Sequence, residues 1–276
     1  MLAGMVKKFA PAGCRIAEFD LPDFDLTNCD QVMTVLRAGG FDTIINCAAY
    51  THVDGCEAEE ALATRVNGDG PGFLAEAAQA SGATLVHVST DYVFSGTSAV
   101  PYTEDAPVGP QTAYGRSKLA GEKAILNSGL PRYFIVRTSW LFGPGGKNFV
   151  ETILRLAGER DELGIVADQV GSPTFTADLA AAMFRLLETR AYGLYHFANS
   201  GHCSWFEFAG EIVRQAQAQG CLARAPLIKP LTTDAYPLPA RRPAYSVLAT
   251  DKLRATTGIK IPAWQDALTH YLALRN

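Results

Sequence analysis

A tyrosine and a lysine stand one helical turn apart in the segment Tyr114-Gly-Arg-Ser-Lys118. On a helix, residues with this spacing share a face, so we expect the lysine ammonium to lie near the phenol. A nearby positive charge favours the ionised phenol and lowers its pKa from about 10. Such a tyrosine can protonate a carbonyl oxygen while a hydride reaches the carbon. Because ordinary surface pairs have the same spacing, the context of this pair decides its interpretation.

That context is a pair of hydroxyls earlier in the chain. Ser89 and Thr90 follow the β-rich run TLVHVS, residues 84–89. Open α/β sheets bind ligands at the carboxyl ends of their strands. We therefore expect Thr90 to hydrogen-bond the same carbonyl oxygen that Tyr114 protonates, although both hydroxyls would also suit a simple turn.

The elements that must position these residues alternate between strands and helices. Strands are expected at residues 14–19, 43–47, 84–89, 133–137 and 194–198. Helices are expected at 28–38, 71–80, 113–127, 149–160, 177–188 and 205–219. Apolar strands that alternate with helices predict a parallel sheet covered on both faces, which is an α/β, Rossmann-like doubly wound fold.

The second half is less regular and predicts a smaller C-terminal substrate-binding domain. We expect a Rossmann-like NAD(P)-binding domain over residues 1–143, with returning segments near 177–200. Residues 144–276 would form mainly the substrate-binding domain. The proline-rich stretches between 226 and 243 are expected to be surface loops.

The start of the chain departs from a complete dinucleotide-binding pattern. Such folds begin with a strand and a glycine-rich turn that brings pyrophosphate to a helix N-terminus. Here MLAGMVKKFA already looks like the helix that follows, and Gly4 alone is no fingerprint. The first strand and the glycine-rich turn are therefore expected to be missing.

Composition excludes several classes of protein. The formal net charge is -4 and no Lys/Arg run occurs, which argues against nucleic-acid binding. No apolar run is long enough for a membrane span. The six cysteines form no Cys-x-x-Cys or Cys/His ligand pattern, so no metal site is expected. We interpret them as reduced thiols of a cytoplasmic protein.

Several segments together resemble the extended short-chain dehydrogenase/reductases, and among them the dTDP-4-dehydrorhamnose reductase family. They are residues 46–57 (NCAAYTHVDGCE), 89–96 (STDYVFSG), 114–118 (YGRSK), 137–143 (RTSWLFG) and 168–174 (DQVGSPT). They occur in the family's order and span most of the chain. The first two are specific to this branch, whereas Tyr-x-x-x-Lys belongs to the whole superfamily.

The resemblance implies a role for each matching position. The catalytic residues would be Thr90, Tyr114 and Lys118, and Lys118 would also hold the nicotinamide ribose. The cofactor would be bound by Asp25, Leu26, Ala48, Ala49 and Tyr50, together with Tyr114 and Lys118. The sugar site would be lined by Thr51, Val53, Asp91 and Trp140.

The implied reaction is reduction of the C4 keto group of dTDP-4-dehydro-L-rhamnose, a nucleotide sugar, by NADPH or NADH. Asp20, at the end of the run 14–19, would favour NADH by accepting from a ribose hydroxyl, and the choice of cofactor stays open. Magnesium assists some members that resemble this chain, although no carboxylate cage is visible. A homodimer is compatible with the resemblance, and the sequence does not specify the oligomeric state.

Several of these residues also have ordinary structural explanations. Trp140 would suit the core, and Asp25 would suit a helix N-terminus. Asn67 would order the lysine through water or cap a turn. Arg241 and Arg242 would suit either a diphosphate or solvent. The alanines 48 and 49 would fit tight packing, and His52, His87 and His196 are expected to be structural.

Two other functions remain open. A nucleotide-sugar epimerase or dehydratase is one, although a dehydratase should carry a carboxylate pair after Thr90, and here Tyr92 follows Asp91. A catalytically silent, reductase-like regulatory subunit is the other, favoured by the missing turn and disfavoured by the intact Thr90, Tyr114 and Lys118.

Overall fold

A parallel four-stranded sheet forms the centre of the computed structural model, which describes residues 1–275. The strands run in the order β1-β2-β3-β8, with β1 at Thr43–Asn46, β2 at Thr84–Thr90, β3 at Tyr133–Thr138 and β8 at Gly193–His196. Three two-stranded pairs lie outside it: β4 (Leu141–Phe142) with β7 (Thr174–Phe175), β5 (Glu162–Val166) with β10 (Leu227–Leu231), and β6 (Val170–Gly171) with β9 (Cys203–Ser204).

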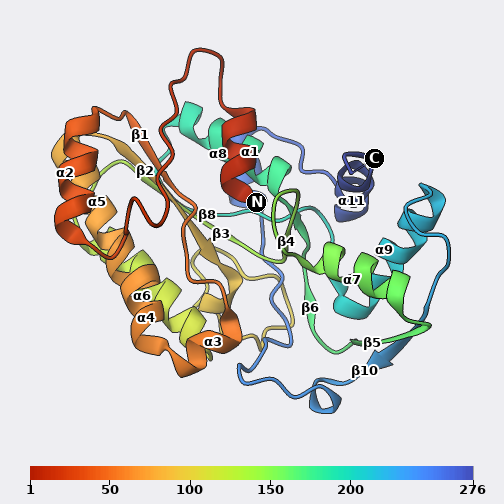
Figure 1. Ribbon diagram of the computed structural model, residues 1–276. Helices are drawn as coiled ribbons and strands as arrows, with labels where there is room; N and C mark the ends of the chain where they lie inside the picture. Colours follow the sequence, from red (N-terminus) through yellow and green to blue (C-terminus); the bar gives the residue numbers. More distant parts are fainter. Residues whose placement is uncertain (276) are drawn as a thin grey trace.

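Helices cover both faces of this sheet (Figure 1). The helices before β3 are α1 (Leu2–Phe9), α2 (Cys29–Gly39), α3 (Val53–Ala58), α4 (Glu60–Thr64), the π-helix η1 (Arg65–Asp69), α5 (Gly70–Ser81), the 3-10 turn η2 (Asp91–Val93) and α6 (Ala113–Asn127). Those after it are α7 (Phe149–Glu159), α8 (Thr176–Thr189), α9 (Trp205–Ala218), η3 (Thr233–Ala235), α10 (Asp251–Thr257) and α11 (Trp264–Ala273). Within residues 1–275, no helix combines the length and the apolar character that crossing a membrane requires.

Alternation along the strands divides the interior into two layers. Leu85 and Ile135 point into a core shared with α2, α5 and α6. Their neighbours Val86 and Phe134 point into a larger core with α1 and α8, which continues to α7, α9 and α11. The doubly wound α/β prediction is therefore confirmed, and the larger core extends without a break beneath the C-terminal elements.

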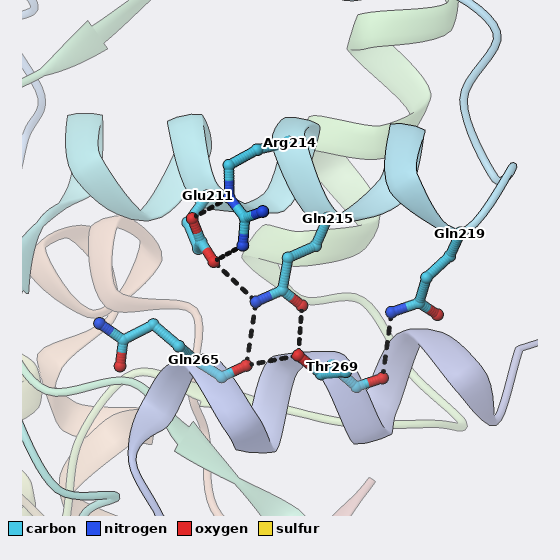
Figure 2. Close-up of polar contacts among 6 residues, drawn as sticks. All are labelled: Glu211, Arg214, Gln215, Gln219, Gln265 and Thr269. Atoms are coloured by element: carbon cyan, nitrogen blue, oxygen red, sulfur yellow. Dashed lines mark hydrogen bonds and ion pairs between the residues drawn. The ribbon is translucent and has the colours of Figure 1, made fainter.

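Polar side chains also join the C-terminal helices (Figure 2). The buried Gln215 of α9 donates to the Gln265 carbonyl at 3.0 Å and accepts from the Thr269 hydroxyl at 2.8 Å, both on α11. Gln219 donates to the Thr269 carbonyl at 3.3 Å. These three bonds fix the register between α9 and α11, because sliding one helix along the other would separate the partners.

Two predictions about secondary structure are wrong. Residues 14–19 form no strand and are exposed. Within the described chain, β1 hydrogen-bonds only β2, so residues 14–19 pair with no neighbouring strand. Asp20 therefore does not end a strand. The 226–243 stretch is not all loop, because β10 pairs in parallel with β5. The helix expected at the start of the chain is present as α1, and no strand or glycine-rich turn precedes it within residues 1–275.

Candidate active site

The catalytic candidates meet where β2 ends and α6 begins. Thr112 caps α6 by accepting from the Gly115 amide at 3.0 Å, and Glu57 of α3 accepts from the Ala113 amide at 2.9 Å. Gly115 lets the helix approach η2 closely, because a Cβ there would lie 2.3 Å from the Tyr92 carbonyl oxygen. These contacts fix the first turn of α6 and hence the position of Tyr114.

Thr90, Asp91 and Tyr114 form a polar cluster at this point. The Thr90 hydroxyl donates to Asp91 Oδ1 at 2.9 Å, and it lies within hydrogen-bonding reach of the Tyr114 phenol. Asp91 is buried, and its Oδ2 has no hydrogen-bond partner within the described residues. Burial raises the pKa of Asp91 to about 6, although the nearby Ser246 and Thr90 hydroxyls oppose the rise. A buried, unpartnered carboxyl oxygen of this kind is suited to a polar ligand group.

The expected effect of Lys118 on Tyr114 is wrong in this structure. Burial raises the pKa of Tyr114 above its usual value, and the Thr90 hydroxyl is the neighbour that opposes the rise. Although the helix puts the two residues on one face, the flexible lysine side chain extends to the sheet. Its Nζ donates to the Val88 carbonyl at 2.7 Å.

Lys118 is one of the most deeply buried charged residues, with 2% of its surface exposed. Burial lowers its pKa to about 8, while Glu122 and Cys47 favour its charged form. Its Nζ also lies 3.3 Å from Nε2 of His87, a fully buried residue in the middle of β2. The Val88 carbonyl takes one Nζ hydrogen, which leaves at least one for a ligand hydroxyl.

The residues that follow β1 are held by Asn67. Its amide accepts from the Tyr50 amide at 2.8 Å and donates to the Tyr50 carbonyl and to the Ser117 hydroxyl, both at 3.0 Å. Asn67 belongs to η1, and π-helical turns are frequent at functional sites. Its contacts in the structure are therefore with the backbone of Tyr50 and with α6 rather than with Lys118. Ala48 is exposed and Ala49 partly so, which leaves the backbone approachable.

Asp25 and Leu26 lie apart from the Thr90–Tyr114 cluster. Asp25 accepts from the backbone and hydroxyl of Thr27, both at 2.8 Å, which lowers its pKa. Leu26 is buried with α2 and α5, and a Cβ on Gly70 would lie 2.6 Å from its Cγ. The pair thus sits at the start of α5, where Leu26 contributes to packing.

Trp140 lies beyond β3 in a strained conformation. Its φ of 46° is rare for a residue other than glycine, and its ring stacks on Trp205 at 3.4 Å. A Cβ on Gly171 would lie 2.5 Å from that ring, so glycine is required opposite it. Strain of this kind persists when neighbours impose it and is concentrated at functional sites.

The sugar-site candidates on α3 are linked to the C-terminal region. Thr51 and Val53 lie at the start of α3, where the next residue, Asp54, accepts from Arg242 at 2.7 Å and from the Ala240 amide at 3.1 Å. One Arg242 nitrogen, Nη1, is buried without a partner within the described residues, whereas Arg241 is exposed. The Asp54–Arg242 pair was not predicted from the sequence, because its members lie far apart in the chain.

The nicotinamide end of a dinucleotide fits these residues, as the buried Lys118 and the small Ala48 and Ala49 show. For a diphosphate, the described chain offers the first backbone N–H groups of α1, whose Met1 lies against Gly146. Among residues 1–275, no group of His, Cys, Asp or Glu side chains could hold a metal ion, so nothing here supports the magnesium expectation.

Comparisons with known proteins show which family this chain belongs to. The RmlD substrate binding domain family matches residues 3–275. A dTDP-4-dehydrorhamnose reductase of Aggregatibacter actinomycetemcomitans is 42% identical over 94% of this chain and 90% of its own. Crystal structures of dTDP-4-dehydrorhamnose reductases from Clostridium acetobutylicum and Bacillus anthracis, the latter in complex with NADP, superpose with TM-scores of 0.94 and 0.93. Each is 40% identical and covers 99% of this chain and 95% of its own. The chain belongs to the RmlD substrate-binding-domain family.

Proposed function

We propose that this chain reduces the C4 keto group of dTDP-4-dehydro-L-rhamnose to give dTDP-L-rhamnose, with NADPH or NADH as the reductant. The observation that carries the proposal is that Thr90 and Tyr114 lie together at the carboxyl end of β2, with Lys118 hydrogen-bonded to Val88 of the same strand. The reductases similar in sequence over nearly the whole chain, one of them in complex with NADP, support the same reaction and cofactor class.

The chain's own residues supply proton transfer and placement. The bound cofactor provides the hydride. Tyr114 keeps its proton at neutral pH, because burial raises the pKa of the phenol, and it donates that proton to the developing alkoxide. Thr90 hydrogen-bonds the same oxygen, and Lys118 holds the nicotinamide ribose with its remaining N–H.

The substrate lies between the sheet and the C-terminal elements in this proposal. Thr51, Val53, Asp91 and Trp140 line the sugar, with Asp91 Oδ2 free to accept from a sugar hydroxyl. Asp25 and Leu26 contact the adenine, and Ala48, Ala49 and Tyr50 flank the cofactor. Residues 1–143 carry the cofactor contacts and these four sugar contacts, and residues 144–276 supply the rest of the substrate-binding domain in this proposal.

Tyr114→Phe tests this assignment. We expect turnover to fall by about 10²–10⁴-fold, the usual contribution of general acid catalysis, with cofactor affinity nearly unchanged. Tyr133→Phe, at the other end of the sheet in β3, is the matched control and should retain full activity. Rates are followed by loss of the reduced nicotinamide absorbance, and cofactor affinity by calorimetry. Turnover retained in Tyr114→Phe would remove Tyr114 from the mechanism.

Three accompanying expectations belong to the proposal as well. In this proposal the six cysteines are reduced thiols, which suits a cytoplasmic location. A homodimer would be seen as twice the chain mass in light scattering. Magnesium dependence would be seen as loss of rate with a chelator, and the proposed chemistry does not require it.

A further inference from the structure

A chain of buried polar groups connects the end of β1 to Lys118. Asn46, the last residue of β1, accepts from the Ala48 amide through Oδ1 at 3.0 Å. Its Nδ2 lies 3.0 Å from His87 Nδ1, and His87 Nε2 lies 3.3 Å from Lys118 Nζ. All three side chains are at most 5% exposed, so water does not substitute for these partners.

The direction of hydrogen bonding along this series of side chains is fixed by the Ala48 amide at one end. Because the Ala48 amide can only donate, the oxygen of the Asn46 amide must face it and the nitrogen must face His87. His87 Nδ1 therefore accepts. Burial and the Lys118 charge hold the pKa of His87 well below its usual value, so the ring is neutral and carries a single proton. That proton must be on Nε2.

An Nε2–H group pointing at Lys118 requires an acceptor. An ammonium has no lone pair, whereas a neutral amine has one. Protonation of Lys118 therefore leaves two donors facing each other, unless the His87 proton moves to Nδ1 and the bond from Asn46 is lost.

We propose that His87 is a positioning residue whose tautomer, set by Asn46, disfavours the ammonium form of Lys118 in the cofactor-free protein. Lys118 then binds its proton more tightly when the His87 tautomer changes or when a ligand compensates. The inference rests on the proposed function only for its kinetic consequence, because the protonation state itself is measurable without turnover.

The other groups around Lys118 act in known directions. Glu122, one turn further along α6, and Cys47, after β1, favour the charged amine. Burial raises the pKa of Cys47 to about 12, so its thiol is neutral, and the amino group of Met1 lies near that thiol. Val88 O accepts from either form of Lys118. Tyr114, on the same helix face, is neutral because burial raises its pKa. His87 is thus the one neighbour in this set that distinguishes the amine from the ammonium by offering a donor.

Nuclear magnetic resonance of the full chain without cofactor tests the proposal directly. Imidazole ¹⁵N shifts report the His87 tautomer, and the ¹³Cε shift of Lys118, assigned with Lys118→Arg, reports its pKa. We expect the Nε2–H tautomer at neutral pH. In His87→Phe and in Asn46→Leu, the Lys118 pKa should rise by roughly half to one pH unit, the equivalent of one hydrogen bond.

His196→Phe is the matched control, because His196 is equally buried and bonds the Tyr102 carbonyl instead. It should leave the Lys118 pKa unchanged. An Nδ1–H tautomer in the wild-type chain, or a Lys118 pKa that stays or falls in both variants, would overturn the proposal. In an active enzyme, the alkaline limb of the kcat profile should move upward by the same amount in both variants. An inactive chain that shows the expected shifts would contradict the proposed function and leave this inference standing.

Discussion

The buried pair Glu122–Arg137 gives the sharpest prediction for stability. Glu122 on α6 accepts from Arg137 on β3 through two hydrogen bonds of 2.9 and 2.6 Å, and the Ser89 hydroxyl also donates to Glu122, at 2.5 Å. The two charged side chains are 1% and 4% exposed. Glu122→Gln keeps the shape of the side chain but leaves the arginine charge without a counter-ion.

The expected cost follows from that burial. Removing one partner of a buried ion pair costs about 3–5 kcal/mol, because the remaining charge is left desolvated and uncompensated. The lower end applies here, because the glutamine oxygen can still accept one of the arginine N–H groups. We therefore expect the free energy of unfolding, measured by urea titration, to fall by about 3 kcal/mol. Glu60→Gln breaks the exposed pair with Arg116 and should cost at most about 1 kcal/mol.

Equal losses in the two variants would refute the argument from burial. The double variant Glu122→Gln with Arg137→Met gives a second test of the argument. It should recover much of the lost free energy of unfolding, because removing both charges relieves the desolvation. If the double variant were less stable than Glu122→Gln alone, the pair would be contributing attraction beyond its desolvation cost.

Three further predictions concern other buried polar groups. Lys118→Met should raise the free energy of unfolding at pH 6 by about 1–2 kcal/mol. The folded-state pKa of about 8 lies below the unfolded value of 10.5, so protonated Lys118 destabilises the fold, and the loss of the hydrogen bond to Val88 offsets part of the gain. This gain should vanish above about pH 10.5, and a gain independent of pH would contradict it. Asp91→Asn should raise the free energy of unfolding by roughly 3 kcal/mol above pH 7 and by nothing below about pH 4. The stability that the wild-type chain has with a neutral Asp91 is lost as pH rises through the folded-state pKa of about 6, whereas asparagine stays neutral. Parallel urea titrations at the two pH values would detect the difference. Gln215→Ala should cost about 2 kcal/mol in the same measurement by removing two hydrogen bonds between α9 and α11, while the Thr269 hydroxyl keeps its 2.9 Å bond to the Gln265 carbonyl. Gln219→Ala, at the exposed end of α9, removes one bond and should cost under about 1 kcal/mol.

The sheet and the helices that carry the candidate site could be predicted from sequence. Continuous apolar strands and capped helices specify β2 and α6, whose lengths and neighbours decide where Thr90 and Tyr114 lie. The strand expected at residues 14–19 could not form, because local β propensity does not supply a hydrogen-bonding neighbour. The pairing of β10 with β5 was hidden by its proline, which suggested a loop.

Side-chain environments were predicted less well than backbone positions. Spacing on a helix places Tyr114 and Lys118 on one face, but only the three-dimensional structure shows that the lysine turns to Val88 and His87. Burial then raises the pKa of the tyrosine, against the expectation from sequence. A histidine within an apolar strand was a signal that a buried partner existed, and it did not identify that partner.

Transfer of a labelled hydride tests the central claim most directly. The chain is incubated with dTDP-4-dehydro-L-rhamnose and NADPH or NADH deuterated at the transferred position, and the sugar product is analysed by NMR and mass spectrometry. The account predicts dTDP-L-rhamnose with one deuterium on C4, formed about 10²–10⁴-fold more slowly by Tyr114→Phe than by the wild-type chain. Cofactor that binds without placing deuterium on C4, or equal labelling by the Tyr114→Phe chain, would contradict it.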